Sequence, residues 1–185
     1  MGVKVSAGNI LIAQPFMDDD NFKRTVIGIT DHGKEGSVGL IQNKVIKVKL
    51  SELIPTIDAE GDFKVFFGGP VATDTIHYIH NVGHLLDDSI KVKNSIYWGG
   101  DFEKLVALIN NGLITDKNIR FYIGYSGWSV GQLEAELESG SWIVSNWDAN
   151  YTFQSEDNQL WEQALGHKGD SYSIIAKIPN SPNKN

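Results

Sequence analysis

The chain has 185 residues, of which 41% are apolar and 21% charged, with no cysteine and a formal charge of −7. This composition is ordinary for a globular protein, and the lack of cysteine excludes disulfides, a thiol nucleophile and thiolate metal ligands. No apolar run reaches the ~20 residues that a membrane-spanning helix needs, and no signal peptide is recognisable, so we expect a cytoplasmic protein with no membrane contact.

The first half of the chain predicts strands joined by short loops. Apolar and β-branched runs predict strands over residues 8–15, 25–30, 38–43, 63–67, 75–80 and 89–92, with a short extended piece at 96–98. The loop over 31–36 is short enough to favour antiparallel pairing of the strands that flank it. Residues 45–53 are ambiguous, and we expect a short helix there that ends before Pro55.

The second half predicts helices separated by strands. Asp101 is a typical helix N-cap, and apolar residues follow it at helical spacing: Phe102, Leu105, Val106 and Ile109. Further strands are predicted over 120–124 and 142–144, a last helix over 160–166 and a final strand over 173–178. Without repeats or linkers, the pattern predicts a single α+β domain over 1–178 and a disordered tail over 179–185.

Residues 124–142 form the most constrained stretch of the sequence. Gly124 and Gly127 are expected to bracket a turn, and Ser129 with Gln132 has the spacing of a capping box at the start of a helix. The helix would have an apolar face against the sheet, with two carboxylates pointing away and one at the flank: Val130, Leu133 and Leu137, then Glu134 and Glu138, then Glu136.

This stretch also begins an acidic segment. Between Arg120 and Lys168 there are seven acidic residues, no Lys or Arg, and four of the five Trp residues. Because affinity for nucleic acid comes largely from cations that displace counterions, we do not expect direct nucleic-acid binding. A solvated acidic face that serves solubility is the simpler interpretation, and a basic or neutral partner is the functional one.

Two patterns resemble catalytic or metal sites without matching them. His77, His80 and His84 would share a face only on a helix, whereas residues 75–80 predict a strand. Ser126 lies between a strand and a helix, but the glycine that a nucleophile elbow needs two residues later is replaced by Trp128. We therefore predict no catalytic residue, metal or cofactor from these patterns.

The run Gly68-Gly69-Pro70 follows a predicted strand. Its backbone amides could face an anion, but the residues that complete a phosphate-binding loop are missing. A bend where two chain segments approach closely is the favoured interpretation.

Six pieces in order resemble the bacterial YqgE/AlgH family. The first four are residues 8–15 with Asp19 and Phe22, then His32, then Gly36, Gly39-Leu40-Ile41 and Asn43, then Gly68-Gly69-Pro70-Val71 with His80. The strongest is 124–128 with 131–134, Glu136 and Trp142, and the last is Trp161 with Gly166. Val45 departs from the family's usual proline, and His77 and His84 match no family position. The resemblance implies a curled, mainly antiparallel sheet approaching a pseudo-barrel, with about three packed helices. Family members are cytoplasmic, without established activity, and often labelled transcriptional regulators.

These observations leave three hypotheses open. The favoured one is a non-enzymatic binding or regulatory protein whose partner is a protein or small ligand; any transcriptional role would be indirect. The second is an enzyme, with a hydrolase as the favoured class, and a cleft joining His32 or His80 to Glu134 or Asp19 would support it. The third is direct DNA binding. Candidate binding residues are His32, Asn43, Gly68, Gly69, Pro70, His80, Tyr125, Trp128, Gln132, Glu134 and Glu136.

Overall fold

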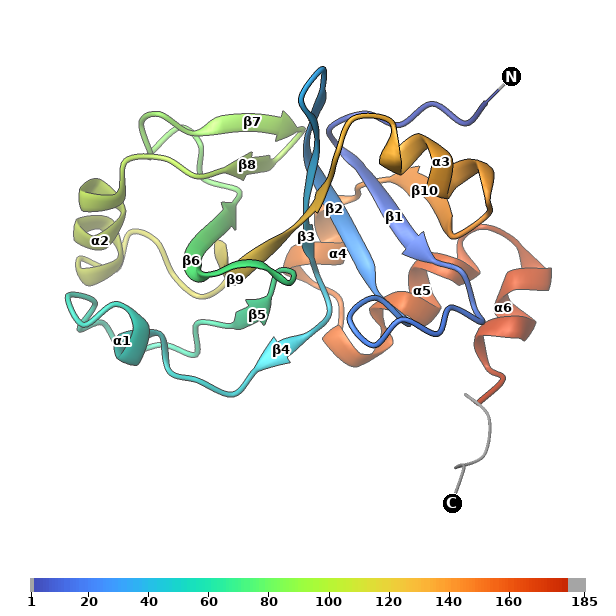
Figure 1. Cartoon of the computed structure of the whole chain (residues 1–185). Helices are drawn as coiled ribbons and strands as arrows, with labels where there is room; N and C mark the ends of the chain where they lie inside the picture. The colour runs from blue at the N-terminus through green and yellow to red at the C-terminus, as the bar shows by residue number, and fades with distance from the viewer. Residues whose placement is uncertain (1, 180–185) are drawn as a thin grey trace.

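The computed structural model describes residues 2–179, in which ten strands form one sheet (Figure 1). The strands are β1 (Asn9–Ala13), β2 (Val26–Gly33), β3 (Gly36–Ile41), β4 (Val45–Ile46), β5 (Val65–Phe67), β6 (Val71–His80), β7 (Ile90–Lys93), β8 (Ile96–Trp98), β9 (Ile119–Trp128) and β10 (Trp142–Asn146). The helices are α1 (Leu50–Leu53), α2 (Phe102–Asn110), α3 (Gln132–Glu138), α4 (Ala149–Phe153), α5 (Leu160–Gly166) and α6 (Asp170–Ala176), with a 3₁₀ turn at Asp157–Gln159.

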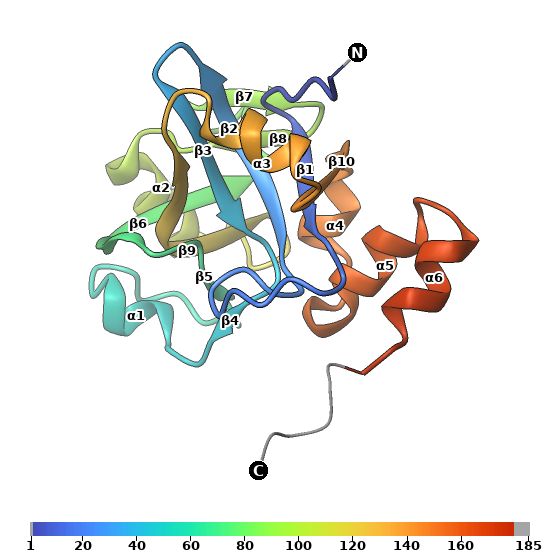
Figure 2. The ribbon, with the colours of Figure 1, turned by 45° about the vertical axis from the view of Figure 1, so that its right-hand side comes forward.

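The sheet is curled and mainly antiparallel. Its strands follow the path β10-β1-β2-β3-β9-β6-β8-β7, and only the pairing of β5 with β9 is parallel within the described residues. The curl brings the two ends of this path together, because Lys93 Nζ of β7 donates a hydrogen bond to Asn146 Oδ1 of β10 at 3.0 Å. The α+β fold with a curled, barrel-like sheet that the resemblance implied is therefore confirmed (Figures 1 and 2).

The central strands are covered on both faces. Ile10 and Ile12 of β1 pack with residues of α4 and α5, whereas Leu11 and Ala13 of the same strand pack in the cluster that contains Leu133 of α3. Strand β9 divides in the same way between the cluster of α4 and α5 and that of α1 and α2. Strands buried on both faces carry near-continuous apolar runs, which explains why β1 and β2 do not alternate in the sequence.

A buried polar network that no sequence pattern predicted crosses the core. Gln42 Oε1 accepts hydrogen bonds from Tyr122 Oη at 2.8 Å and from Thr152 Oγ1 at 2.9 Å. Thr152 Oγ1 in turn accepts from Trp147 Nε1 at 2.8 Å. Because the buried side chains of this network satisfy one another, they tie the helical segment after β10 to β3 and β9.

The predicted helices at 101–110 and 160–166 are present, as is the short helix before Pro55. Asp101 Oδ1 accepts from the Lys104 amide at 2.9 Å, as expected of an N-cap. The described residues contain six α-helices rather than about three: α1 and α4 have only four and five residues, and α6 lies where a strand was predicted. No helix in residues 2–179 is both long and apolar enough to cross a membrane.

The strand predicted over 173–178 is wrong, because helix α6 occupies that part of the chain. An apolar run of so few residues is compatible with either a strand or a helix. Ala176 is buried against α5, whereas Ile174 is 70% exposed, so packing on a neighbouring helix decided the conformation. The tail expected over 179–185 falls outside the described residues, apart from residue 179.

Strand β9 continues through the predicted turn at Gly124 and Gly127 and ends at Trp128. Gly124 does adopt the positive φ expected of it, at 66°, but within the strand. The kink lies between two parts of β9. The part before it pairs with β5 and β6, whereas the part after it pairs with β6 only at Tyr125 and with β3 from Ser126 to Trp128. The hairpin of β2 and β3 is likewise longer than expected, since Gly33 pairs with Gly36 and leaves only Lys34 and Glu35 as its turn.

Candidate functional site

Three residues on adjacent strands form a row under helix α3. His32 of β2 lies opposite Ser37 of β3, and Ser37 lies opposite Trp128 of β9. Directly opposed residues in an antiparallel pair project from the same face of the sheet, so the three side chains share a face. Together with Gln132, Glu134 and Glu136 of α3 and Trp142 of β10 they make up what we term the α3 site.

The turn between β9 and α3 sets the position of the helix. Gly131 has φ of 79° and directly precedes the helix, so Ser129 lies three residues before its first residue. Only half of the expected capping box forms: Gln132 Oε1 accepts from the Ser129 amide at 3.0 Å, but the Ser129 hydroxyl caps no helix amide and donates to the same oxygen at 3.3 Å.

The apolar face of α3 is narrower than predicted. Leu133 is fully buried and Leu137 packs partly against the same cluster, as expected. Val130 was expected to join them, but it is 69% exposed. The left-handed turn at Gly131 starts the helix after Val130, so this side chain does not follow the helical periodicity.

Glu136 joins α3 to the two tryptophans beneath it. Its Oε2 accepts hydrogen bonds from Trp128 Nε1 at 2.9 Å and from Trp142 Nε1 at 2.8 Å. Its Oε1 accepts from Gln132 Nε2 at 3.0 Å. Both indole rings are only 6% exposed and meet edge to face at 6.2 Å between centroids. A carboxylate that satisfies two buried indole N–H groups is a strong structural contact, so Glu136 fixes the helix to the sheet.

Trp128 therefore belongs to the core beneath the site rather than to its surface. It lies in the apolar cluster with Leu133 and Trp142, and its N–H group is already bonded. Replacing a buried tryptophan with alanine costs about 3–5 kcal/mol, so a Trp128 variant would confuse loss of binding with loss of folding.

His32 links β3 to α3 on the more exposed side of the site. Its Nδ1 lies 2.7 Å from Ser37 Oγ, and its Nε2 lies 3.6 Å from Glu134 Oε1. The His32 side chain is 22% exposed and that of Glu134 is 50% exposed, whereas Ser37 is buried. Sequence reasoning did not single out Ser37; only the pairing of β2 with β3 brings it opposite the histidine.

Asn43 does not reach the α3 site. Its Oδ1 accepts from the Val26 amide at 3.0 Å and its Nδ2 donates to the Arg24 carbonyl at 2.9 Å. These bonds satisfy backbone groups at the start of β2. The side chain thus holds the loop before β2 to the end of β3.

The glycines at 68 and 69 lie where two strands approach closely, as favoured from the sequence. A Cβ on Gly68 would lie 2.3 Å from the Gly124 carbonyl, and one on Gly69 would lie 2.2 Å from the Tyr125 backbone. Gly69 also has φ of 155°. Any side chain at either position would force the strands apart. Pro70 follows on the exposed side of this contact.

His80 and Tyr125 also lie away from the α3 site. His80 is fully buried, accepts from the Val82 amide at Nδ1 over 3.3 Å, and donates from Nε2 to the Gly99 carbonyl over 2.8 Å. Its burial lowers its pKa. Tyr125 is half-buried and meets His77 edge to face at 5.7 Å.

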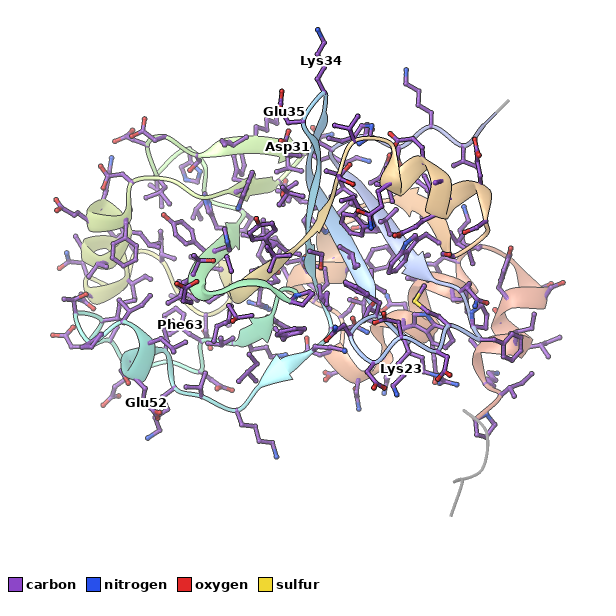
Figure 3. The ribbon with its side chains drawn as sticks, in the orientation of Figure 1. Lys23, Asp31, Lys34, Glu35, Glu52 and Phe63 are labelled. Atoms are coloured by element: carbon purple, nitrogen blue, oxygen red, sulfur yellow. The ribbon has the colours of Figure 1, made fainter. Side chains whose placement is uncertain are left out.

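A cleft joining His32 or His80 to Glu134 or Asp19 would support an enzyme, and only one of these pairings is present. His32 and Glu134 are neighbours, whereas Asp19 Oδ1 caps the Asn21 amide in a separate turn at 2.8 Å. Three surface cavities lie elsewhere: two, of about 440 and 500 Å³, share the segment that includes Phe63, labelled in Figure 3, and one of about 350 Å³ lies between α5 and α6.

The two patterns set aside in the sequence also have structural roles. Ser126 is fully buried, and its Oγ donates to the Gly68 carbonyl at 3.1 Å. His77 lies against Trp98 and Tyr125. Among residues 2–179, no three His, Asp or Glu side chains gather closely enough to hold a metal ion.

The fold and the site define a class of α+β protein in which a curled antiparallel sheet carries a helix bound to it through a Trp–Glu–Trp contact. The chain belongs to the AlgH-like family, whose model matches residues 10–173. It is 41% identical over 178 residues to the UPF0301 protein CT0663 of Chlorobaculum tepidum, an alignment that covers 96% of this chain and 95% of that protein.

Two solved structures are similar over nearly the whole chain. The solution structure of AlgH from Pseudomonas aeruginosa has a TM-score of 0.73 at 26% identity, covering 95% of both chains. The crystal structure of DIP2367 from Corynebacterium diphtheriae has a TM-score of 0.81 at 19% identity, covering 96% of this chain and 95% of that one, and supports the fold alone.

Proposed function

We propose that the chain is a cytoplasmic binding or regulatory protein that holds a protein partner against an exposed surface at α3. This surface, the α3 face, consists of Val130, Glu134 and Glu138 and lies beside the tip of the β2–β3 hairpin. The carbonyl of Trp128 lies against Gly36, which places the start of the turn before α3 beside that hairpin. Figure 3 labels Asp31, Lys34 and Glu35 on this hairpin, with Lys34 at its tip.

The observation that carries the proposal is the exposure of Val130. An aliphatic side chain that is 69% exposed has no role in the core, although a single exposed apolar residue is common on protein surfaces. Here it precedes a helix whose outward carboxylates, Glu134 and Glu138, are exposed. An apolar anchor beside charged residues is typical of a protein interface.

The charge of this surface favours a basic or neutral partner. The segment from residue 121 to 167 contains no Lys or Arg, and Lys34 is the one cation of the hairpin tip. Such a surface repels phosphate backbones, so a role in transcription would act through a protein rather than through DNA.

The test is an affinity capture from native cytoplasm that compares the wild type with Val130→Asp. Val45→Asp is the matched control, since Val45 is also an exposed valine, 48% exposed, but on β4. We expect the wild type and the Val45 variant to retain the same protein, and Val130→Asp to lose it by about tenfold or more.

Equal capture by the Val130 variant, or no protein retained by the folded wild type at low salt, would reject the α3 face as the binding surface. A gel shift of bare DNA at low salt would contradict the inference that the acidic surface prevents DNA binding. Circular dichroism of each variant establishes that the fold is intact.

A further inference from the structure

Ser37 and His32 form a polar pair across strands β3 and β2. Ser37 is 5% exposed, and its hydroxyl lies 2.7 Å from His32 Nδ1. On the other side of the imidazole, Glu134 Oε1 lies 3.6 Å from Nε2. The hydroxyl on β3, the imidazole on β2 and the carboxylate on α3 are thus neighbours in that order. This order of groups activates a serine as a nucleophile.

We propose that Ser37, His32 and Glu134 form a hydrolytic site for small acyl esters. The site shares Glu134 with the α3 face, but its activity does not require a protein partner. Ser37 is the nucleophile and His32 the general base. Glu134 is a positioning residue that acts through His32.

The carboxylate assigns the protons of the imidazole. A negative charge beside Nε2 favours the tautomer that carries its proton on Nε2, and Nδ1 then has the free lone pair. The Ser37 hydroxyl donates its hydrogen bond to that lone pair. When His32 takes up the serine proton, the imidazolium faces Glu134 and is stabilised by it.

The reaction has two balanced steps. Ser37 Oγ attacks the ester carbonyl carbon, its proton passes to His32 Nδ1, and the bond to the alcohol oxygen breaks as that oxygen takes the proton from Nδ1. Water then attacks the acyl-serine and gives a proton to Nδ1, and Ser37 Oγ leaves with that proton. The products are the carboxylic acid and the alcohol, and no other reactant is needed.

The surroundings of Ser37 define the class of substrate. Because Ser37 is buried while the His32 side chain is 22% exposed, substrate approaches along the histidine and only a small acyl group reaches the hydroxyl. Trp128, opposite Ser37 on β9, places an apolar ring beside a short alkyl chain. The half-exposed Glu134 carboxylate beside His32 disfavours an anionic substrate.

The first test is covalent labelling of the intact wild-type protein with a small alkyl fluorophosphonate, followed by peptide mapping. We expect one label per chain, on Ser37. Ser129 is the internal control, because it is exposed and lies one residue beyond Trp128. Labelling that falls on Ser129 and other exposed serines instead of Ser37 would overturn the proposal, as would the absence of any label on Ser37.

The second test follows p-nitrophenyl acetate hydrolysis. Ser37→Ala should abolish the stoichiometric burst, and His32→Gln should slow acylation by about 10²-fold or more, while Ser129→Ala should match the wild type. Glu134→Gln should change the pH profile of the rate as well as its size, which a merely structural role would not do. A burst that survives in Ser37→Ala, shown by circular dichroism to be folded, rejects the site.

Discussion

Glu136 makes the contacts that hold helix α3 to the sheet at the α3 site. It is half-buried and accepts hydrogen bonds from both indole N–H groups and from the Gln132 amide. Its neighbour Glu134, two residues earlier on the same helix, faces His32 and is half exposed. Two carboxylates of one helix therefore have different tasks, and the difference follows from the direction in which each projects.

Replacing Glu136 with alanine should destabilise the protein markedly. Trp128 and Trp142 would each keep a largely buried N–H group without an acceptor, at about 1–3 kcal/mol for each donor. We expect the free energy of unfolding, measured by urea denaturation, to fall by about 2–4 kcal/mol.

Glu138→Ala is the matched control, since Glu138 is exposed on the same helix. It should change stability by less than about 0.5 kcal/mol. Similar losses in the two variants would mean that the indole contacts contribute little and that the helix itself is sensitive to substitution.

At the scale of elements, strand β9 and its kink organise the sheet. The kink at Gly124 lets one strand pair with β5 and β6 along its first part and mainly with β3 beyond it, where β6 pairs only at Tyr125. Gly124 also lies against the backbone of Gly69. A positive φ and a close approach of two backbone segments therefore occur at the same residue. Helix α3 depends on this geometry because the strand leads directly into it.

Gly124→Ala should therefore cost more than Gly131→Ala, although both glycines have positive φ. A Cβ at Gly124 would lie 2.5 Å from the Gly69 carbonyl oxygen, whereas one at Gly131 would meet no atom within 4 Å. We expect about 1 kcal/mol for Gly131→Ala from the left-handed conformation alone. For Gly124→Ala we expect at least 2–3 kcal/mol more, because the strands must move apart.

Thermal and urea unfolding of the two variants provide the measurement. Equal losses of stability would indicate that the crossing of β9 with the Gly68–Gly69 segment can relax, and that conformational preference alone makes glycine necessary.

At the scale of the whole molecule, stability should fall as the pH is lowered from about 7 to 5. Burial lowers the pKa of His77 and of His80 from the ordinary value of 6.5. Below that value the unfolded chain binds protons that the folded chain does not, so acidification favours unfolding. The stabilisation from the neutral histidines is fully present above the pKa of the unfolded chain. It falls progressively as the pH drops towards the lowered pKa of the folded histidines.

The urea midpoint measured across this pH range tests the prediction, and His77→Asn should reduce its slope. His77 is the better position to replace, because it is partly exposed, whereas His80 holds the Gly99 carbonyl within the core. A midpoint that stays constant or rises on acidification would show that other groups dominate the titration.

The candidate site was only partly predictable. Five of its residues, His32, Trp128, Gln132, Glu134 and Glu136, were named from the sequence, while Ser37 and Trp142 were not candidates. Asn43, His80 and the Gly68–Gly69 pair proved to hold backbone segments together. Sequence spacing identifies such residues as constrained, but the partner of each comes from another part of the chain.

The sequence by itself determined the strands of the first half apart from β4, which lies where a short helix was expected, as well as helices α2 and α5 and the acidic character of the segment after Arg120. Each of these follows from local periodicity, capping residues or charge. The family resemblance added the curl of the sheet.

Only the tertiary structure decided that α6 is a helix, that β9 runs through Gly124, and that Val130 is exposed. It also brought Ser37 to His32 and Glu136 to two tryptophans. These features depend on which surface each segment packs against, and packing between distant segments overrides local preference wherever a short run suits two conformations.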